Sequence, residues 1–172
     1  MSKANLVTPR TLAGFMELMP RDQLAFERIR QALEERAWDV IITQQASHDS
    51  GWIESYEPFL GKMLEYIREK QPNARLMLHE TWAYASDSVH PKFVRYNHSQ
   101  KEMFERLYNA YHTMADRYHL PLIRSGELVQ ALRATEMFDE DIGRHQNRIR
   151  EKPVRRIKSS RYFIFIAVAA LK

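Results

Sequence analysis

Short β-prone segments alternate with amphipathic helices along the middle of the chain, and this alternation limits the possible folds more than any other feature. Brief apolar strands are predicted at residues 39–43, 75–79 and 121–123. The spacing of apolar residues predicts helices at residues 21–37, 56–70, 98–118 and 126–134. Strands that are separated by helices form right-handed crossovers. The pattern therefore predicts a parallel sheet with helices on both faces.

The fold class that follows is α/β, with a short parallel sheet in a three-layer α/β/α arrangement. A chain of 172 residues, 44% of them hydrophobic, can bury the core of one compact domain. We expect an N-terminal extension at residues 1–20 and the α/β domain at residues 21–136. The remaining segment, residues 137–172, is first basic and then apolar.

Positive charge is concentrated in that C-terminal segment. The chain carries a net charge of +4, and between Arg144 and Arg161 eight Lys or Arg residues face one acid. Without this run the net charge would be −3, because +4 minus +7 leaves −3. A solvated extension is the favoured interpretation, and contact with anionic lipid or nucleic acid is the alternative. We do not expect nucleic acid as a partner.

The apolar segment Tyr162–Leu171 follows the basic run. It has 10 residues, whereas a helix that crosses a bilayer needs about 20, so no membrane span is predicted. Its β-prone composition predicts that it either completes the sheet as a substitute strand or causes self-association through an exposed edge.

Several classes of protein are disfavoured by composition. The chain has no cysteine, which excludes disulfides and thiolate metal sites. The first residues, MSKANLVTPRTLAG, contain no apolar signal region, so we expect a cytoplasmic location. The chain has five glycines and no glycine-rich phosphate loop, which argues against nucleotide binding, and we expect no cofactor.

Polar and aromatic side chains follow all three predicted strands of the central region. Ligands of open parallel sheets bind beyond the carboxyl ends of the strands, so we expect these side chains to share one crevice. They are Gln44, Gln45, Ser47 and His48 after the first strand, His79, Thr81, Trp82 and Tyr84 after the second, and Arg124, Ser125 and Gly126 after the third.

The residue types at these strand ends suggest binding or acyl chemistry. The amides of Gln44 and Gln45 could stabilise an oxyanion without exchanging protons, or Gln45 could instead tie down a tight loop with Ser47. Trp82 and Tyr84 could form a wall for a sugar ring or an acyl group, or they could close the core.

A histidine next to a glutamate, at positions 79 and 80, invites a metal-site interpretation. The HExxH motif would need a second histidine where the chain has Ala83, so we expect no metal there.

Three segments together resemble a bacterial branch of the SGNH (GDSL-like) hydrolases. They are ALEERAWDVIITQQASHDSG, YEPFLGKMLEYIREKQPNARLMLHETWAYASDS and QKEMFERLYNAYHTMADRYHLPLIRSGELVQALRA. The resemblance implies a flavodoxin-like fold and hydrolysis of acyl or carbohydrate esters by a serine nucleophile without a metal. It also implies Gln45, then Gln44, as the oxyanion donor, and Trp82 in the wall of the substrate pocket.

The chain departs from that family at both ends of the catalytic machinery. The family nucleophile follows the first strand, yet only Ser2 precedes Ser47 here. The family base lies in an Asp-x-x-His motif, whereas Asp141 and His145 are one residue too far apart. A truncated or frame-shifted hydrolase would have this pattern, so we expect impaired catalysis.

Three hypotheses remain open from the sequence. The first is an ester hydrolase with Ser47 or an unrecognised serine as substitute nucleophile and His145 or His48 as base. Ser47 and His48 are a poor pair, because neighbouring side chains on an extended chain diverge. The second is a non-catalytic domain that binds a sugar or an acyl group. The third is an interaction protein whose basic segment contacts an anionic partner.

Overall fold

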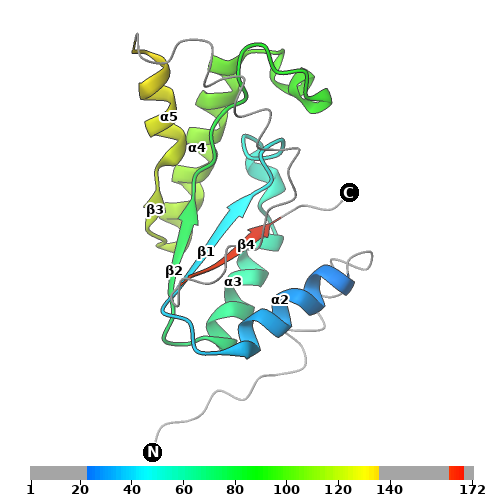
Figure 1. Cartoon of the computed structure of the whole chain (residues 1–172), viewed down its shortest axis with the longest axis vertical. Helices are drawn as coiled ribbons and strands as arrows, with labels where there is room; N and C mark the ends of the chain where they lie inside the picture. Colours follow the sequence, from blue (N-terminus) through cyan, green and yellow to red (C-terminus); the bar gives the residue numbers. More distant parts are fainter. Residues whose placement is uncertain (1–22, 136–162, 169–172) are drawn as a thin grey trace, which may run out of the picture.

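One parallel sheet organises the part of the chain that the structure describes. A computed structural model describes residues 23–135 and 163–168. The sheet has the strand order β3-β2-β1-β4, and every pairing is parallel (Figure 1). The strands are β1 (Val40–Gln45), β2 (Arg75–His79), β3 (Leu122–Ile123) and β4 (Phe163–Val168). The predicted α/β class with a short parallel sheet is confirmed.

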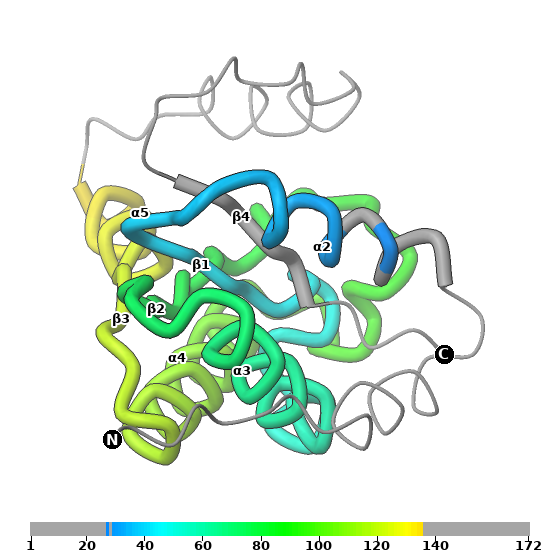
Figure 2. Tube along the Cα trace, turned by 90° about the horizontal axis from the view of Figure 1, so that it is seen from below, coloured from blue at the N-terminus to red at the C-terminus, as the bar shows by residue number. Residues whose placement is uncertain are grey.

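The helices lie between the strands, as the apolar spacing predicts. They are α2 (Gln23–Glu35), α3 (Phe59–Lys70), α4 (Gln100–Tyr118) and α5 (Ser125–Arg133). Two short 3₁₀ helices, η1 (Ile53–Ser55) and η2 (Pro91–Tyr96), lie in the loops that follow β1 and β2. Figure 2 shows α3 and α4 together on one face of the sheet.

The core lies between that face of the sheet and the two helices. Along β1 the residues alternate between buried and partly exposed, and Ile41, Thr43 and Gln45 are the buried ones. The Tyr111 hydroxyl of α4 accepts a hydrogen bond of 3.2 Å from the Gln45 backbone N–H, which ties the helix to this face. Val40, Ile42 and Gln44 therefore belong to the other face, because side chains alternate along a strand.

The junction of α2 and β1 is held by one buried amide. The Gln71 side chain accepts from the Trp38 backbone N–H at 3.0 Å and donates to the Arg36 carbonyl at 2.9 Å. A residue just after α3 thus satisfies backbone groups at the end of α2, where helix carbonyls lack intrahelical partners. This contact places the entrance of β1.

The apolar C-terminal segment supplies the fourth strand. Residues 163–168 pair with β1 along its whole length, from Val40↔Phe163 to Gln45↔Val168. This pairing confirms the prediction that the segment completes the sheet. The predicted N-terminal extension and the basic run at residues 144–161 lie outside the described residues. None of the helices that the structure describes is both long and apolar enough to cross a membrane.

Candidate functional site

Strand register places the ends of β1, β2 and β3 side by side. Thr43 is in register with Leu78, so Gln44 lies beside His79 on the partly exposed face of the sheet. His79 is in turn paired with Ile123, the last residue of β3. Ser125 begins α5 two residues later. Residues far apart in sequence thus meet at the carboxyl edge, where parallel sheets bind ligands.

A continuous hydrogen-bond chain joins three of these side chains. The distance from His79 Nδ1 to Gln44 Oε1 is 2.8 Å, and that from His79 Nε2 to Ser125 Oγ is also 2.8 Å. Because the amide oxygen can only accept, Nδ1 carries the proton and Nε2 accepts from the serine hydroxyl. Burial lowers the pKa of His79, which favours the neutral imidazole. The imidazole thus connects a hydroxyl and an amide through two hydrogen bonds.

The serine of this hydrogen-bond chain lies at the N-terminus of a helix. Ser125 is the first residue of α5, and first-turn N–H groups lack intrahelical partners and carry partial positive charge. The next residue is Gly126, where a Cβ would collide with the Thr81 carbonyl oxygen and lie 2.9 Å from Glu80 Oε1. Glycine therefore allows the start of α5 to pack directly on the exit of β2.

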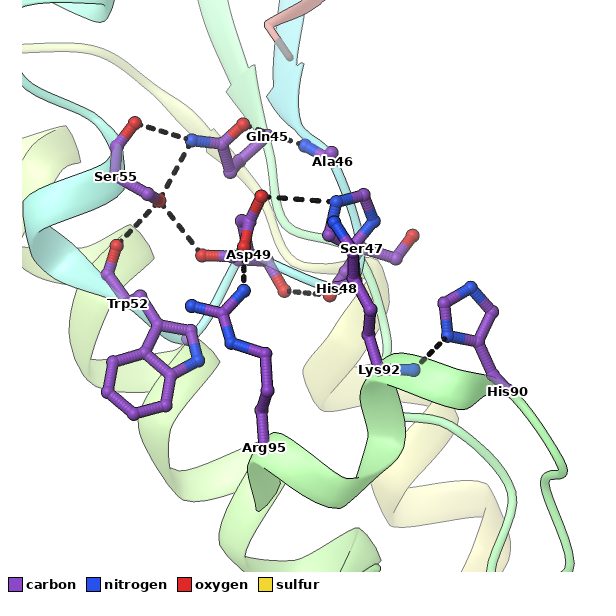
Figure 3. A network of polar contacts seen from close by, with 12 residues as sticks. Gln45, Ala46, Ser47, His48, Asp49, Trp52, Ser55, His90, Lys92 and Arg95 are labelled. Atoms are coloured by element: carbon purple, nitrogen blue, oxygen red, sulfur yellow. Dashed lines mark hydrogen bonds and ion pairs between the residues drawn. The ribbon is translucent and has the colours of Figure 1, made fainter. Parts of the chain in front are cut away.

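Gln45 anchors the loop that follows β1. It is buried, and its Nε2 donates to the Ser55 carbonyl at 2.9 Å and to Ser55 Oγ at 3.0 Å (Figure 3). Its Oε1 accepts from the Ala46 backbone N–H at 2.8 Å. Ser47 contributes its backbone carbonyl, which accepts from Ser50 Oγ at 2.8 Å. The Gln45 amide is thus engaged within the loop, whereas the Gln44 amide points to His79.

His48 belongs to a separate polar network in the same loop. Its Nε2 lies 3.1 Å from Oδ2 of the buried Asp49, and Oδ1 of Asp49 pairs with Arg95 from η2 (Figure 3). The Arg95 guanidinium also lies over the Trp52 ring, 4.9 Å from its centroid. The Tyr96 hydroxyl donates to the His48 carbonyl at 3.0 Å. These contacts fasten the β1 loop to η2.

The two aromatic candidates after β2 lie in different environments. Trp82 is 38% exposed. Tyr84 is buried and packs edge-on against Phe93, with ring centroids 5.4 Å apart, and beside His90 at 4.8 Å. Trp82 therefore offers surface to a ligand, while the Tyr84 ring is part of the core.

A group of potential metal ligands lies beside the hydrogen-bond chain. Glu80 follows His79 directly, and its ligand atoms lie within 4.8 Å of those of His112 and Glu127. The HExxH motif would place a second ligand at position 83, where the chain has alanine. The histidine of this group comes instead from α4, which no local spacing around Glu80 could indicate.

Ser125 is the site residue whose role sequence reasoning missed. Its position after the third strand is predicted from the sequence, but the sequence pattern indicates no chemical role for it. The available signal was its position, because a hydroxyl residue directly between a strand and a helix is held at the edge of the sheet beside free backbone N–H groups.

The comparisons with known proteins agree with this architecture. A family described as "Domain of unknown function (DUF4886)" matches residues 22–163. The chain belongs to the DUF4886 family. It is also similar to a solved crystal structure of a DUF4886 family protein from Bacteroides uniformis ATCC 8492, with 36% sequence identity and a TM-score of 0.56.

That similarity covers part of each protein. It spans 59% of this DUF4886 chain and 40% of the Bacteroides uniformis chain. The DUF4886 chain therefore matches less than half the length of this relative. The search of curated proteins found no match to the present chain.

Proposed function

We propose that this DUF4886 chain is a serine-dependent ester hydrolase. Ser125 is the nucleophile, His79 is the general base and Gln44 orients the imidazole. The observation that carries the proposal is the continuous hydrogen-bond chain from the serine hydroxyl through the imidazole to the amide, with both distances at 2.8 Å. A nucleophile within hydrogen-bond reach of a base, and a base oriented by a third group, is the arrangement that acyl transfer requires.

Each group has a defined task in this reaction. Ser125 Oγ attacks the ester carbonyl carbon while its proton passes to His79 Nε2. The Gln44 amide oxygen holds the proton on Nδ1, which keeps Nε2 free to accept. Positive His79 then donates the proton to the leaving alkoxide as the C–O bond breaks. A water molecule, deprotonated by the same nitrogen, then attacks the acyl carbon. The bond from that carbon to Ser125 Oγ breaks, His79 returns the proton to Oγ, and the carboxylic acid leaves.

The N-terminus of α5 is assigned to the developing oxyanion. The side-chain amide of Gln45 is bonded to Ser55, so it is not the donor in this assignment. The proposed donor is the Gly126 N–H, which follows Ser125 directly at the positively polarised start of the helix. The next two N–H groups contact Glu80 and the Arg124 carbonyl.

The substrate class rests on the resemblance to SGNH hydrolases, which act on acyl and carbohydrate esters. The α/β fold and a polar site at the carboxyl edge of the sheet support this assignment. In that superfamily the nucleophile follows the first strand, so Ser125 is a nucleophile in a different position of a related fold. Exposed Trp82 is the proposed contact for an acyl chain or a sugar ring.

Covalent labelling tests the nucleophile directly. Full-length protein is treated with a fluorophosphonate, and the modified peptide is identified by mass spectrometry while p-nitrophenyl acetate hydrolysis is followed in parallel. We expect the label on Ser125, and Ser125→Ala lowers the hydrolysis rate by about 10²-fold or more because it removes the attacking oxygen.

Other serines of the chain provide the controls. Ser86→Ala, at an exposed loop position, is expected to hydrolyse at the wild-type rate. A label on Ser47, together with loss of activity in Ser47→Ala and not in Ser125→Ala, would move the nucleophile to the β1 loop and overturn the proposal. Equal rates in wild type and both variants would exclude serine catalysis altogether.

A further inference from the structure

Three potential metal ligands from three different elements converge next to the candidate catalytic residues. Glu80 follows β2, His112 lies in the middle of α4 and Glu127 lies in the first turn of α5. One ligand atom of each lies within 4.8 Å of the others. His112 Nε2 is already 3.0 Å from Glu127 Oε1.

Glu80 is the member of this group whose surroundings most favour a cation. Its side chain is fully buried, and neither carboxylate oxygen makes a hydrogen bond to a side chain among the residues that the structure describes, so the hydrogen-bond contact of this carboxylate is with the Glu127 backbone N–H. A buried carboxylate that no cation balances costs roughly several kcal/mol, so such groups are normally paired with a cation or coordinate a metal. The charge of Arg124 reaches Glu80, but its guanidinium forms its ion pair with the other glutamate, Glu127 Oε2, at 3.6 Å.

The geometry is close to that of a coordinated ion. Two ligands at about 2.1 Å from a tetrahedral metal lie about 3.4 Å apart. The present separations of up to 4.8 Å therefore need only a modest contraction, and the 3.0 Å pair is already close enough. The side chains of His112 and Glu127 are 33% and 28% exposed, which leaves an entry path above the buried Glu80.

From these observations we infer that Glu80, His112 and Glu127 form a binding site for a divalent transition-metal ion. One imidazole nitrogen and two carboxylate oxygens suit Zn²⁺, with water completing the coordination. Mg²⁺ binds less tightly, because it prefers six oxygen ligands in an octahedron and retains its waters.

The inference is independent of the proposed hydrolase. None of the three ligands belongs to the hydrogen-bond chain, although Glu80 adjoins His79 and Glu127 lies two residues after Ser125. A bound ion would link the exit of β2, the middle of α4 and the start of α5. Its expected effect is greater stability, because the ion binds the folded state and the unfolded chain lacks the assembled site.

Calorimetric titration of the metal-free full chain tests the site without reference to activity. Zn²⁺ is added at about pH 7.5, and Mg²⁺ is added in a separate arm. We expect saturation at one equivalent of Zn²⁺ and at least about tenfold weaker Mg²⁺ binding. Glu80→Gln and His112→Gln each weaken Zn²⁺ binding by about tenfold or more, because each removes a ligand. Glu105→Gln, at an exposed position of α4, binds as wild type.

A second measurement applies to the wild-type chain, whether or not the variants fold. Diethyl pyrocarbonate modification of histidines is mapped by mass spectrometry with and without one equivalent of Zn²⁺. Protection of His112 but not of exposed His119 supports the site. Wild type that shows no saturable one-equivalent binding, folded ligand variants that bind as tightly as wild type, or His112 that stays unprotected would each overturn it.

Discussion

At the residue scale, Gln44 is the member of the hydrogen-bond chain with the clearest chemical consequence. It contacts His79 with a neutral amide oxygen, at the position where a carboxylate would stabilise the imidazolium that forms during acyl transfer. An amide keeps the correct tautomer but adds no opposing charge. The wild-type site is therefore expected to be a slow hydrolase.

Substitution Q44E should strengthen the base. A carboxylate at hydrogen-bond distance favours the protonated imidazole, so we expect the pKa of His79, which burial now lowers, to rise. The rate of p-nitrophenyl acetate hydrolysis near pH 8 should rise with it. NMR titration of the His79 ring and the pH–rate profile measure the two effects. Gln44→Leu is the comparison and should lower the rate. An unchanged His79 titration in Q44E would show that the two side chains do not interact in solution.

Glu80 makes a prediction about stability in metal-free protein. Burial, with a smaller contribution from Glu127, raises the pKa of the Glu80 carboxyl from 4.5 to about 7, and the Glu127 backbone N–H opposes the shift only in part. The folded chain then holds a proton that the unfolded chain has lost, so this group's stabilisation is complete below about pH 4.5 and is lost as the pH rises through 7.

Thermal unfolding in the presence of a chelator measures that effect. Between pH 5 and pH 8 the Tm of wild type should fall relative to that of Glu80→Gln, whose amide cannot ionise. Excess Zn²⁺ should restore wild type at pH 8 and raise the Tm of the variant clearly less, because the variant lacks one ligand. Parallel Tm curves for the two proteins under chelation would contradict the raised pKa.

At the scale of elements, the contact between the start of α5 and the exit of β2 depends on one glycine. Gly126→Ala places a methyl group against the Thr81 carbonyl oxygen, and backbone cannot move aside as a side chain can. We expect a loss of about 1–3 kcal/mol in the free energy of unfolding. Denaturant titration provides the measurement.

Gly61→Ala in α3 is the matched control for that substitution. Its new methyl group meets the hydroxyl end of Tyr118, a side chain that can shift, and alanine is the better helix former by about 0.5–1 kcal/mol. The loss in Gly61→Ala should therefore be clearly smaller. Equal losses in the two variants would argue that the close approach at Gly126 does not matter for stability.

The limits of sequence reasoning also belong to the scale of elements. Apolar spacing predicted the helices and strands of residues 23–135 because each pattern is local, as in the stripe of α3. The pairing of Gln44 with His79 depends on the register of β1 with β2, which places Thr43 opposite Leu78. The approach of His112 to Glu80 depends on how α4 packs against the sheet. Local sequence patterns therefore predict neither contact.

At the scale of the whole molecule, β4 protects the outer edge of β1. Removing residues 163–172 should leave unpaired the β1 backbone groups that face β4, while those that face β2 stay paired, so we expect self-association and a lower Tm. Size-exclusion chromatography with light scattering measures the first effect. A variant that lacks only residues 169–172 retains the strand and is expected to behave as wild type. A monomeric, equally stable protein without residues 163–172 would contradict a role of β4 in the sheet.

The distant origin of β4 has a consequence for synthesis on the ribosome. One of the two sheet neighbours of β1, the strand β4, is translated only after α5 and the residues that follow it. At about 5–20 residues per second, the nascent chain waits roughly 2–7 seconds between completing α5 and completing β4. During that interval each nascent chain on a polysome exposes the β1 backbone groups that later pair with β4. Slow elongation and high-level expression should therefore favour inclusion bodies. Co-expressed chaperones that bind nascent chains should raise the yield of soluble protein.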